Sequence, residues 1–486
     1  MRILLIYLAP LDNEPMGLMC IGTSLKEAGY LVKIIGIEKH ESERKLLKEI
    51  SDFKPDIVGI SIITSLSDKA QHIANFIKNN FSKITIIAGG PHPTILPYET
   101  LKNGNIDIGV IGEGELTAVD LVETLSSSRP LEKVRGIAFI KNGNLVLTEK
   151  REYIENLDDL PFADRELMPK DVIYGRAGYP VANPVAFLMT VRGCPYQCSF
   201  CQPTLGNLFG KKVRRRSPES VIAEIIELKK KYGINGLWIN DDTFMFNRDW
   251  VEKFCDLMIE KKLNMLWYSN GRINCVDKDI LIKMRDAGCV GLVLTPESGS
   301  ARIRNEILNK NLSDEEILKA YRICHEVGIP MQANIMLASP TETEKDMDLS
   351  ITLIKKLQPH FMSYSYTTAL PGTYLYSKYA KEISASPYYS HSENYDIGKF
   401  KKMGTNIPDS KLRAAQNLFN AYSSNSFSNR ARHFFQYPYF RKILYKRWKT
   451  LIFNRHPNFK HLIFDFAAII LGSVIYFKNR EIYKTV

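Results

Sequence analysis

Apolar runs and amphipathic stretches alternate along the first quarter of the chain. Runs rich in Ile and Val stand at residues 2–8, 31–37, 56–62, 84–90 and 106–112. Between them lie stretches with the helical spacing of apolar residues, such as 19–30 and about 68–80. Because strands buried on both faces read as continuous apolar runs, the alternation predicts a doubly wound parallel sheet with helices on both sides. We expect an open, Rossmann-like domain at residues 1–125.

The pattern weakens between residues 126 and 183. A hairpin-like stretch at 136–149 is followed by a Pro-punctuated segment at 157–171. Neither alternates with helices, so this range is predicted to be a linker.

Strand and helix patterns return after residue 184. Six β-rich runs stand at 185–191, 236–241, 263–270, 290–298, 330–339 and 360–366. Helical segments such as 217–233 and 313–328 separate them, which predicts a β/α barrel at 184–376 with its site at the carboxyl ends of the strands. The predicted fold class is therefore α/β: a Rossmann-like doubly wound sheet, a partial (β/α)6 barrel, and a mostly helical C-terminal region at 377–486.

Composition agrees with a multidomain globular protein. The 486 residues exceed the usual size of one core, and 45% are apolar and 24% charged. Eight cysteines are too sparse for a disulfide scaffold, so a reducing compartment is expected. The first residues read as a buried strand and lack the cleavage pattern of a signal peptide, which favours a cytoplasmic protein.

The net charge of +12 is concentrated in the C-terminal region. From Arg430 onward, 12 Lys and Arg face 2 acidic residues, which leaves only +2 for the rest of the chain. Basic and aromatic residues interleave at 430–460, and an uncharged run of 12 residues, 466–477, is too short to span a bilayer, which takes about 20. The pattern is typical of an interfacial anchor on the inner membrane face. A helix packed on the barrel and a surface for nucleic acid are the alternatives, and nucleic acid is not expected.

Three cysteines, Cys194, Cys198 and Cys201, follow the first barrel strand with C-x3-C-x2-C spacing. Three thiolates can hold three irons of a [4Fe-4S] cluster and leave the fourth iron open. A zinc site completed by a distant histidine and three unrelated buried thiols are the alternatives. The spacing, with Phe200 before the last cysteine, resembles the signature of the radical S-adenosylmethionine family. The resemblance implies that S-adenosylmethionine chelates the open iron and that reduction cleaves it to methionine and a 5′-deoxyadenosyl radical.

Further positions match that family on later strands. The resemblance implies contacts with S-adenosylmethionine from Asp241 and Asp242, from Arg272, and from Glu297 and Ser298. The segment 335–346 departs from the family's Gly-rich pattern, because Ala338 and Ser339 replace its small residues.

The N-terminal domain resembles the cobalamin-binding members of the family. Small-residue turns follow three of its strands, at the edge where such sheets bind ligands, although tight connections between elements would look the same. No G-x-G-x-x-G follows the first strand, which disfavours a dinucleotide. The resemblance implies cobalamin contacts from Ser61, Thr64, Gly89, Gly90, Gly112 and Glu113. The loop after the first strand lacks the histidine that ligates cobalt in other cobalamin domains. His92 could contact the cofactor, although a loop position that faces solvent is the expectation.

Together these features predict a cobalamin-dependent enzyme that methylates an unactivated carbon of a small-molecule or lipid-like, amphipathic substrate. Flavodoxin or ferredoxin is the expected type of electron donor. An oxidative cyclase of the magnesium-protoporphyrin monomethyl ester type is the nearest alternative. A methylthiotransferase is disfavoured because the N-terminal domain has only Cys20, and a cobalamin or iron-sulfur sensor is the non-enzyme alternative.

Overall fold

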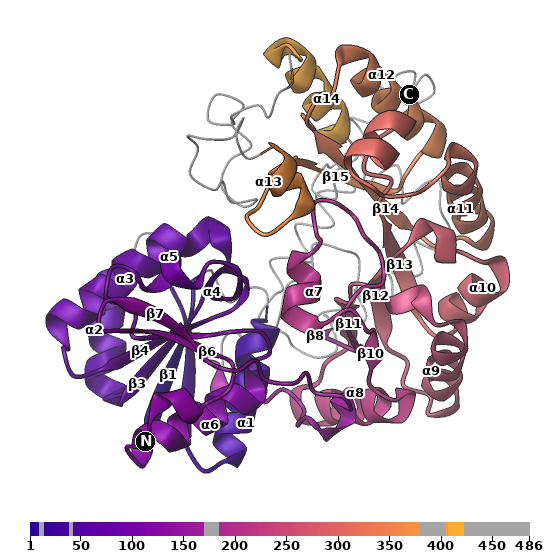
Figure 1. Ribbon diagram of the computed structural model, residues 1–486. Helices are drawn as coiled ribbons and strands as arrows, with labels where there is room; N and C mark the ends of the chain where they lie inside the picture. Colours follow the sequence, from indigo (N-terminus) through magenta and orange to yellow (C-terminus); the bar gives the residue numbers. More distant parts are fainter. Residues whose placement is uncertain (9–13, 38–41, 170–183, 380–404, 406, 422–486) are drawn as a thin grey trace.

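The computed structural model describes residues 1–8, 14–37, 42–169, 184–379, 405 and 407–421. Two α/β halves lie side by side, and the helix α7 (Thr204–Phe209) lies between them (Figure 1). The predicted fold class is confirmed, with a Rossmann-like sheet followed by a barrel-like parallel sheet.

The N-terminal half is built on a seven-stranded sheet in the order β2-β1-β3-β4-β5-β6-β7. Its parallel strands are β1 (Arg2–Tyr7), β2 (Leu31–Gly36), β3 (Ile57–Ser61), β4 (Thr85–Gly89) and β5 (Ile108–Val110). The antiparallel strands β6 (Ile137–Lys141) and β7 (Asn144–Leu147) complete it. The carboxyl ends of the parallel strands therefore meet at one edge.

Helices cover both faces of this sheet. The helices α1 (Met16–Glu27) and α6 (Glu115–Ser126) pack on one face, and α2 (Ser42–Phe53) and α3 (Ser67–Asn80) pack on the other. The short helices α4 (Pro91–Ile95) and α5 (Pro97–Leu101) follow β4. Because both faces are covered, the strands are apolar throughout, as their sequence indicated.

The strands β6 and β7 form the hairpin expected at 136–149. Its two turn residues, Asn142 and Gly143, have φ of +50° and +78°, the left-handed backbone of a type I′ turn. The hairpin pairs with β5, so the N-terminal sheet continues into the range 126–183 that the sequence assigns to a linker. Short 3-10 turns follow at Leu157–Asp159 and Arg165–Leu167.

The second half is a six-stranded parallel sheet in the order β15-β14-β13-β12-β11-β8. The strands are β8 (Val185–Leu188), β11 (Gly236–Ile239), β12 (Leu266–Gly271), β13 (Cys289–Leu294), β14 (Met331–Leu337) and β15 (Phe361–Tyr366). The helices are α8 (Pro218–Tyr232), α9 (Arg248–Glu260), α10 (Lys278–Asp286), α11 (Asp314–Val327) and α12 (Glu344–Leu357). In the part of the chain that is described, β8 and β15 do not pair, so the barrel is partial, as predicted.

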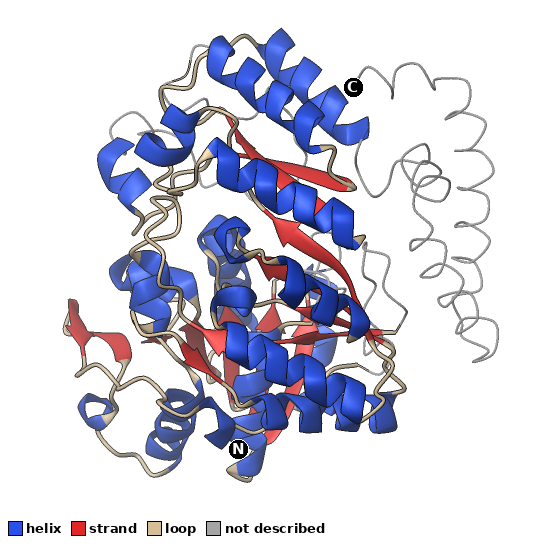
Figure 2. Ribbon diagram, turned by 90° about the vertical axis from the view of Figure 1, so that its right-hand side faces the viewer, coloured by secondary structure: helices blue, strands red, loops and turns tan. Residues whose placement is uncertain are grey.

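The helices lie along one side of these strands (Figure 2). Strand residues such as Leu237 and Ile239 pack with them in one large apolar core. The alternating residues, such as Trp238, face the concave side because successive side chains in a strand point to opposite faces. The partial barrel thus has an apolar outer layer and a separate interior surface.

Helix ends in this half follow local sequence signals. A capping box at Ser313 and Glu316 starts α11, and Gly328 ends it with φ of +80°. A two-residue ladder, β9 (Val191–Arg192) with β10 (Arg214–Arg215), links the segment after β8 to the segment after α7.

Of the C-terminal region, the structure describes α13 (Tyr374–Tyr379) and α14 (Asp409–Ala421). The basic and aromatic segment 430–460 and the apolar run 466–477 lie outside the described residues. Among the described helices, none combines the length and the apolar character needed to cross a bilayer.

Candidate functional site

The three cysteines lie in one loop after β9. The backbone N–H groups of Cys201 and Gln202 both donate to the carbonyl of Cys198, at 3.1 and 2.9 Å, which makes a tight turn. Cys198 is buried, whereas Cys201 is exposed. Desolvation by the surrounding protein raises the pKa of Cys194 and raises the pKa of Cys201 to about 12. Iron binding would release these protons, since a coordinated thiol is deprotonated.

The loop brings three free thiols together in eight residues. Across the ranges that the structure describes, no three His, Cys, Asp or Glu side chains stand close enough together to hold one metal ion. A cube of four irons spaces its thiolates more widely than one ion does, and the loop supplies three of them.

Arg272 places a positive charge beside this loop. Its guanidinium lies 3.6 Å from the centroid of the Tyr196 ring, and its Nη1 lies 3.9 Å from Cys198 Sγ. Its buried Nε has no hydrogen-bond partner in the described part of the chain. A cation with a free donor at this position suits a negatively charged, thiolate-ligated cluster and its carboxylate-bearing ligand.

The two aspartates after β11 have different environments. Asp241 is buried, and its carboxylate accepts hydrogen bonds from the backbone N–H groups of Thr190 and Val191 at 2.7 and 3.2 Å. It therefore holds the end of β8, and burial raises its pKa to about 6. Asp242 is exposed, and partial desolvation by the neighbouring protein raises its pKa. Of the two, Asp242 has the carboxylate that a bound molecule could reach.

Glu297 lies after β13 in a strained conformation, with φ of +66°. Its carboxylate is buried and accepts from Lys310 Nζ at 2.8 Å and from Asn334 Nδ2 at 3.2 Å. Lys310 also donates to Thr295 Oγ1 at 3.0 Å. Strain of this kind persists where the surroundings fix it, often at ligand sites. Sequence reasoning identified Glu297 but missed Lys310, which lies 13 residues away.

Ser298, the next predicted contact, is turned inward. Its hydroxyl accepts from the N–H of Ser300 at 3.1 Å and lies 3.4 Å from Ser350 Oγ. Because the residue has no exposed surface, its hydroxyl shapes the loop from within.

We predict that Glu297→Gln and Lys310→Met raise the KM for S-adenosylmethionine about tenfold or more, since hydrogen bonds to charged groups contribute about 1.5–3 kcal/mol. Iron content and the cluster's visible absorbance should stay unchanged. The measurement is deoxyadenosine formation against S-adenosylmethionine concentration. Glu306→Gln, an exposed change in the same segment, is the control. If the KM were unaltered in both variants, Glu297 and Lys310 would not contact S-adenosylmethionine.

The segment after β14, where the sequence departs from the family pattern, is ordered by Glu342. Its Oε2 accepts from the N–H of Ser339 at 2.9 Å, and Ser339 Oγ lies 2.8 Å from Thr367 Oγ1. Ala338 takes the left-handed conformation, with φ of +56°. Glu342 is buried, its Oε1 has no partner within the described residues, and burial raises its pKa to about 8.

The raised pKa of Glu342 predicts that the free energy of unfolding depends on pH. Its folded-state pKa lies above its unfolded value, so the stability it contributes is present at low pH and is lost as pH rises through about 8. One pKa unit corresponds to about 1.4 kcal/mol, and the folded-state pKa stands about two units above pH 6. The free energy of unfolding of Glu342→Gln, relative to that of the parent, should therefore rise by about 3 kcal/mol between pH 6 and pH 9. Urea unfolding at pH 6 and pH 9 measures this. An equal effect of the substitution at both pH values would contradict it.

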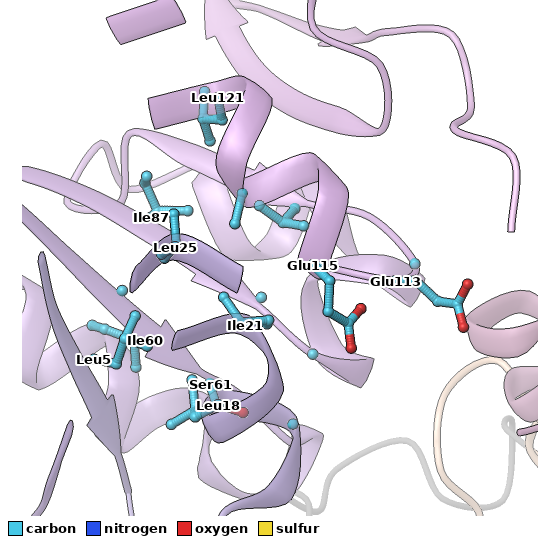
Figure 3. A pocket seen from close by; sticks show the side chains of 18 of the residues that line it. Leu5, Leu18, Ile21, Leu25, Ile60, Ser61, Ile87, Glu113, Glu115 and Leu121 are labelled. Carbon is cyan, nitrogen blue, oxygen red and sulfur yellow. The ribbon is translucent and has the colours of Figure 1, made fainter. Parts of the chain in front are cut away.

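The N-terminal half contains an apolar cavity of about 290 Å³. Aliphatic side chains of the sheet and of α1 and α6 point toward one another in it, with the carboxylates of Glu113 and Glu115 at one side (Figure 3). Glycines contribute to its wall, among them Gly59, Gly89 and Gly112. Removing side chains at strand ends lets a bulky ligand approach the backbone. The cavity therefore fits part of a large cofactor.

Five of the six predicted cobalamin contacts line this cavity, namely Ser61, Gly89, Gly90, Gly112 and Glu113. Gly90 has φ of +101°, and a Cβ there would lie 3.0 Å from the Ile62 carbonyl oxygen, so the turn favours glycine. Thr64 is buried in the 3-10 turn Thr64–Leu66 and does not line the cavity. The expectation that His92 faces solvent is wrong. His92 is 5% exposed, because it lies on the buried side of α4.

Both halves of the molecule build the cavity. Met189 and Arg192 from the segment after β8, and Leu208 and Phe209 from α7, belong to its wall. Glu113 is already paired by protein groups, with Arg192 Nη1 at 2.9 Å and Arg214 Nη2 at 2.9 Å. Sequence reasoning missed these arginines, because nothing local marks a contact across 79 residues.

Comparisons with known proteins agree with this arrangement. Residues 3–122 match the B12 binding domain family, and residues 188–354 match the Radical SAM superfamily. An uncharacterized methyltransferase of Pyrococcus horikoshii is 31% identical over 365 residues, which cover 75% of this chain and 78% of that protein. The anaerobic magnesium-protoporphyrin IX monomethyl ester cyclase of Cereibacter sphaeroides is 27% identical over 76% of this chain and 61% of its own length. The radical S-adenosylmethionine methyltransferase TsrM of Kitasatospora setae, solved with cobalamin and a [4Fe-4S] cluster, shares the fold, with TM-score 0.63, 17% identity, and coverage of 79% and 78%.

The fold and the site thus define an enzyme in which a cobalamin-type domain is joined to a radical S-adenosylmethionine barrel. The chain belongs to the cobalamin-binding radical S-adenosylmethionine family. The cofactors of this family are a [4Fe-4S] cluster, S-adenosylmethionine and cobalamin, and the cysteine loop and the cavity fit them. The sensor alternative is not supported.

Proposed function

We propose that this protein is a C-methyltransferase that acts on an unactivated carbon of an amphipathic substrate. The observation that carries the proposal is the cavity wall shared by the two halves, because it brings the cobalamin domain up to the segment that leads into the cysteine loop. The 31% identical relative is named a methyltransferase, which favours methyl transfer over ring closure.

When bound, the cluster and S-adenosylmethionine supply a radical that removes hydrogen from the substrate, and cobalamin supplies a methyl group. The chain's own residues would hold these groups in separate places. Cys194, Cys198 and Cys201 would ligate iron, while Asp242, Arg272 and the Glu297–Lys310 pair would bind the polar groups of S-adenosylmethionine. Ser61, Gly89, Gly90 and Gly112 would contact cobalamin. Asp241 and Ser298 would keep the surrounding loops in place.

The barrel interior supports an amphipathic substrate. On one side, the Trp238 ring stacks on Tyr268, with centroids 5.0 Å apart, and contacts the tilted ring of Phe187 at 4.7 Å. Trp238 Nε1 has no partner among the described residues. On the other side, Gln332 donates to Ser363 Oγ at 3.0 Å, and Ser363 donates to Asn334 Oδ1 at 3.0 Å. An apolar wall facing a polar wall suits a ring or chain that carries a hydrogen-bonding group.

Isotope transfer tests methylation against ring closure. Reconstituted, reduced protein is incubated with S-adenosylmethionine bearing a trideuterated methyl group and with two probes, a total bacterial lipid extract and magnesium-protoporphyrin monomethyl ester. A product that carries the deuterated methyl supports the proposal. Loss of hydrogen from the porphyrin, with no deuterium gained, would instead establish the cyclase alternative.

We infer a cytoplasmic protein whose residues 430–477 lie on an anionic membrane surface, with flavodoxin or ferredoxin as the electron donor. Co-sedimentation with phosphatidylglycerol vesicles, lost when residues 430–486 are removed and absent with phosphatidylcholine vesicles, would support the surface assignment. Equal sedimentation of both forms would refute it.

A further inference from the structure

Four buried charged side chains join the loop after β5 and the start of α6 to the β9–β10 ladder beside the cysteine loop. We call Glu113, Glu115, Arg192 and Arg214 the loop clamp. Arg192 donates to Glu113 Oε1 at 2.9 Å and to both carboxylate oxygens of Glu115. Arg214 donates to Glu113 Oε2 and Oε1 at 3.0 and 2.9 Å. All four side chains are at most 7% exposed, so water screens these contacts little.

On the barrel side, the clamp is fixed to the cysteine loop. Arg192 and Arg214 stand opposite each other in the β9–β10 ladder. Gly193 follows with φ of +90°, and a Cβ there would lie 2.7 Å from the Lys212 carbonyl oxygen. The next residue is Cys194, so a displacement of Arg192 would move the first cysteine.

On the N-terminal side, the clamp forms part of the cavity. Glu113 and Glu115 flank Gly114, and all three residues line the cavity. The Glu113 carboxylate also accepts from the N–H of Ile154 at 3.0 Å, and Arg214 donates to the Phe209 carbonyl at 2.7 Å. A displacement of these carboxylates would therefore change the cavity wall.

We propose that the loop clamp sets the position of the cobalamin cavity relative to the cysteine loop, with Arg192 as the positioning residue. The inference rests on the proposed function, since it assumes that the cavity receives cobalamin. The reaction needs one substrate carbon to meet both the radical and the methyl donor, and small misplacements of reacting groups slow such steps strongly. A rigid connection between the two loops would hold both reacting groups at the required distance from that carbon.

Arginine has a specific role in this tie. Its planar fork can serve Glu113 and Glu115 at once, whereas a lysine ammonium is a single point charge on a flexible stem. The clamp has no net charge, because two arginines face two glutamates. Arg192→Lys preserves this charge balance but removes the planar fork that donates to Glu113 and Glu115 together.

A second buried ion cluster offers a matched control. Arg165 donates to Glu14 at 3.0 and 3.1 Å, to Glu224 at 3.3 Å and to the Phe187 carbonyl at 2.7 Å. It is 1% exposed and also ties the N-terminal half to the barrel. It touches neither the loop after β5 nor the cysteine loop, so Arg165→Lys removes an equally buried fork without altering the clamp.

The test measures the magnetic interaction between the two cofactors. Full-length protein is reconstituted with iron, sulfide and hydroxocobalamin and reduced with dithionite, so that the cluster and Co(II) both carry unpaired electrons. Pulsed electron paramagnetic resonance then gives the distribution of cluster-to-cobalt distances in the parent, Arg192→Lys, Glu115→Gln and Arg165→Lys proteins. We expect the parent and Arg165→Lys to share one narrow distribution, and the two clamp variants to shift or broaden by about 1 Å at full cofactor loading.

The outcomes are distinct. An unchanged distribution in loaded clamp variants, or equal broadening in Arg165→Lys, overturns the positioning role and leaves the proposed function intact. Glu115→Gln keeps the contact between Arg192 and Glu113, so it reports on the clamp if Arg192→Lys does not fold. Absence of cobalamin from the parent protein overturns the proposed function and this inference with it.

Discussion

Replacing Cys198 by alanine is expected to reduce deoxyadenosine formation by about a thousandfold or more, because the cluster loses one of three ligands and with it the chemistry that the cofactor supplies. Cys198 is the middle ligand of the loop, and its carbonyl accepts two backbone hydrogen bonds that form the turn. The side-chain change leaves those bonds in place. The loss of deoxyadenosine formation should therefore result from weakened iron binding. Iron content, the visible spectrum and a dithionite-driven assay measure it.

Cys255→Ala is the matched control, since Cys255 is equally a buried thiol but packs in the outer core of the barrel. It should cost some stability through the lost packing and should leave iron content near that of the parent. If Cys198→Ala retained the parent's cluster spectrum and activity, the cysteine loop would not be the cluster site.

Replacing Gly89 by phenylalanine is expected to reduce cobalamin affinity by about tenfold or more while the cluster still forms, since overfilling a packed site costs about 1–3 kcal/mol. Gly89 ends β4 and lines the cavity of about 290 Å³. A Cβ at this position would make an ordinary contact, 3.9 Å from Val110 Cβ, and its φ is not positive. The backbone therefore tolerates a side chain, and a phenyl ring would enter the cavity.

Gly89→Ala is the control at the same position. Its methyl group fits the available space, so cobalamin should remain bound. Equilibrium dialysis with hydroxocobalamin gives the affinities, and iron analysis verifies the cluster. Equal cobalamin binding by the parent and Gly89→Phe would place the cofactor somewhere other than this cavity.

The regular elements could be predicted because their signals are local. Apolar runs of seven residues contain the strands β1 to β5, which are three to six residues long, and the Asn142–Gly143 pair forms the expected hairpin turn. The cysteine spacing identified the cluster loop for the same reason, since all three ligands lie within eight residues. What the sequence pattern could not tell is that the hairpin extends the N-terminal sheet, because strand pairing depends on tertiary contacts.

The roles of the polar residues could not be predicted, because they depend on contacts between residues that are far apart in the sequence. A carboxylate after a strand can reach a cofactor or hold a neighbouring strand, and the structure separates the accessible Asp242 from Asp241, which holds the end of β8. Glu113 is predicted to contact cobalamin and lines the cavity, and the structure adds that two distant arginines pair with its carboxylate. Lys310 and Arg192 escaped notice because their partners lie 13 and 79 residues away.

Whether this protein is an enzyme with two cofactors is decided by anaerobic reconstitution of the purified protein with iron, sulfide and hydroxocobalamin, followed by a visible spectrum and a dithionite-driven assay for 5′-deoxyadenosine. We expect cobalamin to stay bound after desalting and deoxyadenosine to form only when the cluster is present. Deoxyadenosine formed by a protein that retains no cobalamin would contradict the proposed methyl transfer, because it would leave a radical enzyme without a methyl donor.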